Sequence, residues 1–276
     1  MTGKKVDLYG VVGHPVGHSR SPLIHRLFAE QTGQRMDYVP IDAAPGQFLE
    51  ALAEFRRRGG QGLNVTLPYK GDAYRFATRL TSRSEAAEAV NTLCWRDKEV
   101  LGDNTDGAGL VTDLTANLGF ALTNSRVLLL GAGGAARGAI APLLAHSPAE
   151  LVIANRTVSR AHDLAKRFSV MGPVSATGFG DLLGVFDLII NSTSASLAGE
   201  IPPLPATTVS SKTLCYDMMY QKGPTTFLTW AGMQGATIIA DGTGMLVEQA
   251  AESFFLWRGV RPDTGPVLRE IRRRLS

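Results

Sequence analysis

The sequence of 276 residues is 44% hydrophobic and 19% charged, and its 28 lysines and arginines exceed its 25 aspartates and glutamates by a net charge of +3. This balance is typical of a folded globular protein and excludes a disordered chain, which would need low hydrophobicity and a high net charge. The length favours two domains or one large domain, and the basic excess is too small to indicate a nucleic-acid-binding protein.

Short apolar runs rich in β-branched residues alternate along the chain with longer segments in which apolar residues recur every three or four positions. The short runs predict strands and the longer segments predict amphipathic helices. The predicted strands are residues 9–12, 38–41, 63–66, 127–130, 151–154, 188–190, 214–216 and 237–239, and the predicted helices are residues 22–30, 48–58, 110–118, 135–145 and 159–168. This alternation predicts an α/β protein whose parallel sheets are covered on both faces.

Two polar, turn-rich stretches divide these elements into domains. The first is residues 102–107, and the second is residues 241–244, after which the chain is predicted to be helical to its end. We therefore expect residues 108–241 to form a central domain inserted between the two parts of another domain, residues 1–107 plus 242–276.

Polar residues follow the first predicted strand. Ser21 and Pro22 predict a helix N-cap and the first helical residue. Ser19 and Ser21 lie two residues apart beside free helix amides, so the same pair also suits a bound carboxylate. The spacing alone leaves both interpretations open.

A second polar group begins in the strand predicted at residues 63–66. Asn64 and Thr66 share one face of this strand, which ends at Pro68, and Lys70 begins the next segment. A lysine at the carboxyl end of a strand lies where the active sites of α/β proteins form. The spacing is also compatible with a solvated surface lysine.

Further polar residues lie before and within the first turn-rich stretch. Asn91 is in an apolar segment, where a buried amide needs hydrogen-bond partners or a ligand. Asp103 and Asp106 are concentrated where the two domains are expected to meet. The stretch therefore predicts either a cleft or a hydrated interdomain turn.

A glycine-rich turn follows the strand predicted at residues 127–130, in a chain with 30 glycines. Gly131 would allow the tight turn, Gly133 would let the backbone approach a pyrophosphate, and Ala136 would let the helix pack close to the strand. The amides that open the helix would form an anion site. This context predicts dinucleotide binding, with a purely structural turn as the alternative.

The tip of the next predicted strand carries no acidic residue. An NAD-binding domain would present Asp or Glu to the ribose 2′-hydroxyl about 20 residues after the glycine turn. Here Arg156 and Arg160 offer two guanidinium groups to a 2′-phosphate, and Asn155 can form hydrogen bonds without charge. The pattern favours NADP, with a pair of ordinary surface arginines as the alternative.

Cysteines, histidines and apolar runs carry little further information. Cys94 and Cys215 lie far apart in apolar surroundings and predict two buried, reduced thiols. The N-terminal histidines lack partners at metal-ligand spacing, so we expect no metal. There is no signal-like apolar segment and no run of about 18 apolar residues. We expect a cytoplasmic protein with no membrane or nucleic-acid partner.

Taken in order, these motifs resemble the shikimate dehydrogenase family. The segments that carry the resemblance are residues 19–22, 64–70, 91–92, 102–107, 131–136, 155–157, 216–220 and 241–249. The resemblance implies an α/β substrate-binding catalytic domain with a mainly parallel sheet, a Rossmann NADP-binding domain, and C-terminal helices that return to the first domain.

Enzymes of this family reversibly reduce 3-dehydroshikimate to shikimate with NADPH, a step of chorismate and aromatic amino-acid biosynthesis. The resemblance implies that Ser19 and Ser21 hold the substrate carboxylate and that Lys70 and Asp106 form the catalytic pair. The other implied substrate contacts are Asn64, Thr66, Asn91, Tyr220 and Gln249. The implied cofactor contacts are Gly131, Ala132, Gly133, Gly134, Ala135, Asn155, Arg156, Thr157, Arg160, Thr193, Met218 and Gly242.

Two other functions are weighed against this one. Quinate/shikimate dehydrogenases that use NAD tend to carry Asp at the second strand tip, where this chain has Asn155. A non-catalytic shikimate-binding sensor would need a broken catalytic pair, whereas Lys70 and Asp106 are both present. The family resemblance leaves the choice between a monomer and a homodimer open.

Overall fold

The computed structural model describes residues 6–193, 195 and 199–275, and the chain divides into two compact units. The first unit comprises Met1–Gly109 and Val247–Ile271, and the second comprises Leu110–Leu246 and Arg272–Ser276. Each unit contains one six-stranded sheet. The predicted α/β class is therefore confirmed.

The sheet of the first unit is mixed. Its strands are β1 (Asp7–Gly13), β2 (Met36–Asp42), β3 (Gly60–Val65), β4 (Arg79–Leu80), β5 (Thr92–Arg96) and β6 (Glu99–Asp103), in the order β2-β1-β3-β5-β6-β4. β1 pairs in parallel with β2 and β3, and β4 pairs in parallel with β6. β5 runs antiparallel to both of its neighbours. The sheet is thus mainly parallel, with one reversed strand.

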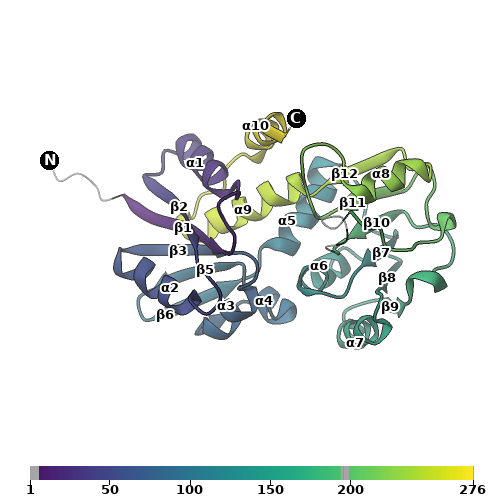
Figure 1. Ribbon diagram of the computed structural model, residues 1–276, viewed down its shortest axis with the longest axis horizontal. Helices are drawn as coiled ribbons and strands as arrows, with labels where there is room; N and C mark the ends of the chain where they lie inside the picture. Colours follow the sequence, from purple (N-terminus) through teal and green to yellow (C-terminus); the bar gives the residue numbers. More distant parts are fainter. Residues whose placement is uncertain (1–5, 194, 196–198, 276) are drawn as a thin grey trace. The chain divides into compact units, whose positions relative to one another are not determined.

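Helices cover both faces of this sheet (Figure 1). They are α1 (Ser21–Thr32), α2 (Phe48–Arg57), α3 (Lys70–Phe76), α4 (Ser82–Ala87) and the part of α9 (Thr243–Arg258) that belongs to this unit. Phe48, Leu52 and Phe55 of α2 pack in one cluster with residues of β3 and β5. On the opposite face α1 meets α9, where the rings of Phe28 and Phe254 lie 5.6 Å apart. Alternation of side chains along the strands supplies both apolar faces.

The sheet of the second unit is fully parallel. Its strands are β7 (Arg126–Leu130), β8 (Glu150–Ala154), β9 (Val174–Thr177), β10 (Leu188–Asn191), β11 (Leu214–Asp217) and β12 (Ile238–Asp241), in the order β12-β11-β10-β7-β8-β9. Counted within this unit the order is 3-2-1-4-5-6, which is that of a Rossmann sheet. The strand order reverses between β7 and β10, where ligands of such sheets bind.

Helices α6 (Gly134–Leu144), α7 (Val158–Phe168) and α8 (Thr226–Met233) connect these strands. Phe227, Leu228 and Ala231 of α8 pack on one face of the sheet with Leu128 and Ile189. The remaining elements are α5 (Asp106–Thr112), a π-helix at Asp113–Asn117, short 3-10 helices at Phe179–Asp181 and Ala206–Thr208, and α10 (Thr264–Leu275). No helix among the described residues is long and apolar enough to cross a membrane.

The sequence predictions differ from the structure in several short elements. Strands β4, β5, β6 and β9 and helices α3, α4 and α8 were not predicted. The strand expected at residues 63–66 ends at Val65, so that Thr66 lies just beyond it. The helix expected at residues 110–118 begins earlier, at Asp106, and continues as a π-helix after Thr112.

The predicted N-cap at Ser21 is wrong. Arg20 occupies the cap position, Ser21 is the first residue of α1, and Pro22 is the second. The hydroxyl of Ser19 accepts a hydrogen bond from the Ser21 backbone amide at 3.2 Å. Ser19 therefore accepts a hydrogen bond from one of the amides that lack a partner within the helix. The sequence had predicted this capping role for Ser21.

Candidate active site

Lys70 and Asp106 form an ion pair in the first unit. Lys70 Nζ lies 2.7 Å from Asp106 Oδ2, and the side chains are 31% and 15% exposed. The other carboxylate oxygen of Asp106 accepts a hydrogen bond from Asn91 Nδ2 at 2.9 Å. The pair is thus only partly shielded from bulk water, and the ammonium group remains accessible to a small ligand.

The chain brings this pair together through two local turns. After β3, the Thr66 amide bonds to the Val12 carbonyl and the Tyr69 amide bonds to the Thr66 carbonyl, and α3 then begins at Lys70. After β6, Asn104 Oδ1 accepts the Asp106 amide at 3.1 Å as α5 begins. Each of the two side chains therefore stands at the start of a helix that directly follows a strand end or its turn.

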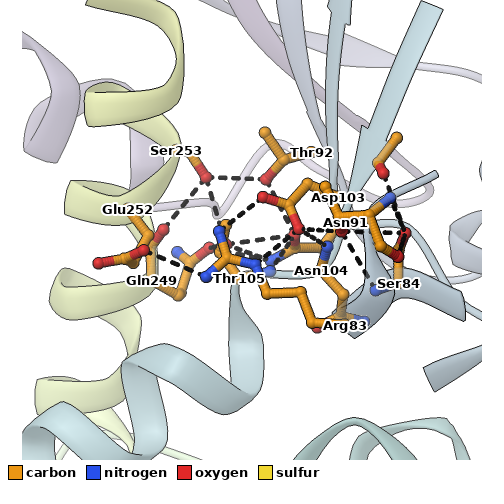
Figure 2. Close-up of polar contacts among 12 residues, drawn as sticks. Arg83, Ser84, Asn91, Thr92, Asp103, Asn104, Thr105, Gln249, Glu252 and Ser253 are labelled. Carbon is orange, nitrogen blue, oxygen red and sulfur yellow. Dashed lines mark hydrogen bonds and ion pairs between the residues drawn. The ribbon is translucent and has the colours of Figure 1, made fainter. Parts of the chain in front are cut away.

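A buried polar cluster surrounds Asn91 (Figure 2). Asn91 Oδ1 accepts the Thr105 amide at 2.8 Å, while Asn91 Nδ2 donates to Thr105 Oγ1 at 2.8 Å and to Gln249 Oε1 at 3.3 Å. A Cβ on Gly109 would lie only 2.6 Å from the Gln249 backbone nitrogen, so glycine allows α9 to approach α5 here. Asn91, Asp106 and Gln249, predicted from widely separated segments, thus lie in one cluster.

Asn64 lies at the other side of this cluster, and both polar atoms of its side-chain amide have hydrogen-bond partners. Its Oδ1 accepts from the Tyr38 hydroxyl at 2.7 Å and contacts His25 Nε2 at 3.2 Å. Its Nδ2 donates to Ser253 Oγ at 2.9 Å and to Thr92 Oγ1 at 3.1 Å. The orientation of the Asn64 amide is therefore fixed by the protein itself.

His25 and Tyr38 are stacked, with ring centroids 4.2 Å apart. Burial lowers the pKa of His25 to about 3, so its ring is neutral at physiological pH. Burial raises the pKa of Tyr38 well above its ordinary value, while a hydrogen bond from Ser21 acts in the opposite direction. Tyr38 thus connects Ser21, a predicted carboxylate contact, with Asn64.

The remaining predicted substrate contacts lie close to these residues or in the other unit. Ser19 is bonded to the Ser21 amide, and Thr66 packs against Gly13 at the end of β1, where a Cβ would overlap the threonine methyl group. Tyr220 belongs to the second unit and is half-buried. Whether these side chains touch substrate stays a prediction.

The second unit gathers the predicted cofactor contacts along one sheet edge. The last residues of β12, β11, β10, β7 and β8 lie in register as neighbours, namely Asp241, Asp217, Asn191, Leu130 and Ala154. The predicted contacts follow these ends directly or within two residues: Gly242, Met218, Thr193, Gly131 and Asn155. This row spans the point where the strand order reverses.

The glycine turn after β7 has the conformation that the sequence predicts. Gly131 has φ +104°, and a Cβ there would lie 2.9 Å from Ser192 Oγ. The next glycines, Gly133 and Gly134, are exposed and open α6, and a Cβ on either would contact none of the described residues. Ala132 is half-buried and Ala135 exposed. The turn therefore leaves room for a ligand to approach the backbone, as dinucleotide binding requires.

The tip of β8 is polar and exposed. Asn155 Nδ2 donates to the Thr157 carbonyl at 2.9 Å, and the Arg160 amide donates to the same carbonyl at 3.1 Å. Arg156, Thr157 and Arg160 are exposed where α7 begins at Val158. The two guanidinium groups are thus available to an anion such as a phosphate.

Hydrogen bonds fix the other strand ends. Thr193 Oγ1 donates to Asn191 Oδ1 at 2.7 Å, and Asn191 Nδ2 donates to Asp217 Oδ1 at 3.2 Å. Gly242 lies against Met218, because a Cβ would overlap the Met218 carbonyl, and its amide donates to the Met219 carbonyl at 3.1 Å. Met218 and Gly242, two of the predicted cofactor contacts, are therefore in contact with each other.

Tyr38, Thr105 and Ser253 were missed by the sequence predictions. Ser253 bonds to Asn64 and Thr92, and it lies four residues after Gln249 on the same face of α9. This helical spacing was a signal that could have revealed it. Tyr38 and Thr105 gave no comparable signal, because their hydrogen-bond partners lie on other segments of the sequence.

Other candidate chemistry is limited. Cys94 and Cys215 are buried free thiols, and burial raises the pKa of Cys215 to about 12. Among residues 6–193, 195 and 199–275, no group of His, Cys, Asp and Glu side chains could hold a metal ion.

Three family models match the chain. The shikimate dehydrogenase substrate binding domain matches residues 11–93, the shikimate/quinate 5-dehydrogenase model matches residues 114–198, and the shikimate 5′-dehydrogenase C-terminal domain matches residues 242–272. The chain belongs to the shikimate dehydrogenase family. The resemblance seen in the sequence is therefore confirmed, and each model covers segments in which that resemblance was found.

Relatives extend over nearly the whole chain. A shikimate dehydrogenase (NADP(+)) of Nitrosospira multiformis is 57% identical over 271 residues, covering 98% of both chains. The relative of the same name from Hahella chejuensis is 54% identical over 97% of this chain and 99% of its own length. The shikimate 5-dehydrogenase of Thermus thermophilus, solved with NADP(H) and shikimate, is 32% identical with a TM-score of 0.85, covering 98% of this chain and 100% of that one.

Proposed function

We propose that this protein catalyses the reversible, NADPH-dependent reduction of 3-dehydroshikimate to shikimate in the shikimate pathway. The observation that carries the proposal is the 2.7 Å pair of Lys70 and Asp106, set beside the amides of Asn91 and Gln249. Relatives at 57% and 54% identity are named as shikimate dehydrogenases that use NADP. This family and this pair together support the activity.

The first unit supplies groups that suit the substrate. Shikimate is an anion with three hydroxyl groups, so its pocket needs hydroxyl and amide partners and a positive charge. Ser19 and Ser21 at the start of α1 would hold the carboxylate through their hydroxyl groups. Asn64, Thr66, Asn91, Asp106 and Gln249 would bind the ring hydroxyls, and Tyr220 is a further proposed substrate contact.

Lys70 would serve as acid in the reduction. Bound NADPH supplies a hydride to the carbonyl carbon of the substrate. The carbonyl oxygen then gains negative charge, which the Lys70 ammonium can stabilise before transferring a proton to it. Asp106 would orient the substrate hydroxyl and hold Lys70 in place through the 2.7 Å contact. In the reverse direction Lys70 takes the proton back.

The second unit fits NADP. The open backbone at Gly133 and Gly134 would receive the pyrophosphate at the start of α6. Asn155, Arg156, Thr157 and Arg160 would surround the adenosine 2′-phosphate. Thr193, Met218 and Gly242 would border the nicotinamide end of the same sheet edge. We accordingly assign most substrate contacts to residues 1–107 plus 242–276 and most cofactor contacts to residues 108–241; Tyr220 and Gly242 are the exceptions.

We further propose that the enzyme acts in the cytoplasm, as a monomer or a homodimer, on a small-molecule substrate alone. The small net charge of +3 supports the expectation that it has no nucleic-acid partner.

The deciding experiment is an initial-rate assay of shikimate and quinate, each with NADP and with NAD. We expect the highest kcat/KM for shikimate with NADP. A higher value for quinate with NAD would assign the protein to the quinate/shikimate subclass, and no shikimate-dependent formation of NADPH would overturn the proposal.

A further inference from the structure

We propose that Arg83 is a positioning residue for this reaction, acting through Asp103 on the segment that carries Asp106 and through Glu252 on the helix face that carries Gln249. The inference rests on the proposed function, since it concerns the same catalytic pair. Arg83 lies on α4, outside every motif used to predict the site.

Arg83 binds Asp103, the last residue of β6, through two nitrogens of its guanidinium group (Figure 2). Nε donates to Asp103 Oδ1 and Nη2 donates to Asp103 Oδ2, each at 2.6 Å. The side chain of Asp103 is only 2% exposed, whereas that of Arg83 is 32% exposed. A bidentate pair of this kind fixes direction as well as distance.

Asp103 passes this constraint to the catalytic carboxylate. Its Oδ1 also accepts the amide of Asn104 at 2.7 Å, and its backbone carbonyl accepts the Asn91 amide at 3.0 Å. Asn104 in turn accepts the Asp106 amide on Oδ1 at 3.1 Å. The position of Asp106 relative to Asn91 therefore depends on where Asp103 is held.

The third nitrogen of Arg83 connects this segment with α9. Nη1 donates to Glu252 Oε2 at 3.2 Å. Glu252 lies three residues after Gln249, so both occupy neighbouring positions on one helix face. Gln249 meets Asn91 and Thr105 on that face, at 3.3 and 3.4 Å. One guanidinium group thus holds both elements that line the Asn91 cluster.

The electrostatics of Asp103 depend on Arg83. Burial alone would raise the pKa of Asp103, but the hydrogen bonds and charge of Arg83 hold it below its ordinary value. Without Arg83 the buried carboxylate would lose its counter-ion, which is strongly unfavourable. Asp103 would then have to move or take up a proton, and either change would displace residues 104–106.

A second ion pair in the same unit provides a matched control. Arg258 Nη1 lies 2.6 Å from Asp7 Oδ2, and Arg258 also contacts Gln34 and Tyr9. None of these residues is a predicted contact of substrate or cofactor. Loss of Arg258 should therefore reduce stability without changing the geometry of the catalytic pair.

The test compares Arg83→Gln and Arg83→Lys with Arg258→Gln, at a temperature where circular dichroism shows each protein folded. The measured quantities are kcat and the KM values for shikimate and for NADP. We expect Arg83→Gln to lower kcat about 100-fold, since a displacement of about 1 Å at a reacting group can cost that much. The KM for NADP should stay within about twofold, because the cofactor contacts lie in the other unit.

Arg83→Lys should lower kcat about tenfold, since lysine keeps the positive charge but cannot form the bidentate hydrogen bonds of arginine. The kcat of Arg258→Gln should stay within about twofold of the wild-type value. A folded Arg83→Gln protein with wild-type kcat would overturn the inference, as would an equal loss in Arg258→Gln. If Arg83→Gln does not fold, wild-type kcat in Arg83→Lys would overturn it. An inactive wild type would instead overturn the proposed function, and this inference with it.

Discussion

Lys70 and Asp106 each begin a helix, and Lys70 Nζ lies 2.7 Å from Asp106 Oδ2. The helix dipole favours a carboxylate at this end of a helix and disfavours an ammonium group. The placement of Asp106 thus agrees with the local preference, and that of Lys70 opposes it. Sequences break such local rules mainly at functional sites. The ion pair offsets the unfavourable position and leaves a cation where the proposed chemistry needs one.

Replacement of Lys70 by methionine should remove this chemistry. General acid catalysis contributes about 10²- to 10⁴-fold, and we expect kcat to fall by that factor in Lys70→Met. Shikimate binding should remain measurable by calorimetry, because the serines and amides stay in place. The control is Lys98→Met, which removes an exposed lysine between β5 and β6. A rate near that of the wild type would exclude Lys70 from the chemistry.

Arg156 and Arg160 should determine the preference for NADP. If they bind the 2′-phosphate, the double variant Arg156→Ala, Arg160→Ala should raise the KM for NADP by about 100-fold or more, since each charge-assisted contact contributes about 1.5–3 kcal/mol. The KM for NAD should change little, because NAD lacks that phosphate. Initial rates with both cofactors measure the difference.

The double variant Lys166→Ala, Arg167→Ala is the matched control for charge, since it removes two exposed basic residues from the last turn of α7, the helix that contains Arg160 and begins just after Arg156. Its ratio of KM values for NADP and NAD should equal that of the wild type. Equal changes for both cofactors in the Arg156, Arg160 double variant would refute the assignment.

How much of this structure the sequence predicts depends on whether the signal is local. The glycine turn after β7 was predicted because its glycines lie between a clear strand and a clear helix, and Gly131 has a positive φ in the structure. The β5–β6 hairpin was missed because Asp97 takes φ +52° with no glycine after it, and Asp-Gly or Asn-Gly is the usual signal. β4 has two residues, too few to show any periodicity.

The candidate site divides in the same way. Lys70 and Asp106 were singled out by their places after a predicted strand and within a polar turn, but their pairing was implied only by the family resemblance. Arg83 was missed because one of its partners, Glu252, is 169 residues away. Such contacts exist only once the sheet has brought α4 and α9 to the same cluster, so no single segment of sequence contains them.

His25 should make the stability of the protein depend on pH. Burial lowers its pKa to about 3, whereas an unfolded histidine has a pKa of about 6.5. Between these values the unfolded chain binds a proton that the folded protein does not, so stability is full above about pH 6.5 and falls as the pH decreases toward 3. The expected contribution is about 1.4 kcal/mol per pH unit near pH 5.

Urea unfolding of the wild type and His25→Gln at pH 7, 6 and 5 measures this contribution. The variant should show a slope of unfolding free energy against pH that is smaller by about that amount. Ile24→Ala, a buried substitution in the same helix, should lower stability at every pH and keep the wild-type slope. An unchanged slope in His25→Gln would show that His25 does not titrate in this way.

Two glycines of the turn after β7 should respond to alanine in different ways. Gly131 has φ +104° and a Cβ there would lie 2.9 Å from Ser192 Oγ, so Gly131→Ala should destabilise the protein by about 1–3 kcal/mol. A Cβ on Gly133 would contact none of the described residues, and φ there is −88°, so Gly133→Ala should keep the wild-type Tm. Its methyl group would instead occupy the space proposed for the pyrophosphate and raise the KM for NADP about tenfold or more. Gly180→Ala, which likewise meets no described neighbour, is the control and should change neither quantity. A wild-type KM for NADP in Gly133→Ala would mean that the pyrophosphate does not lie against this turn.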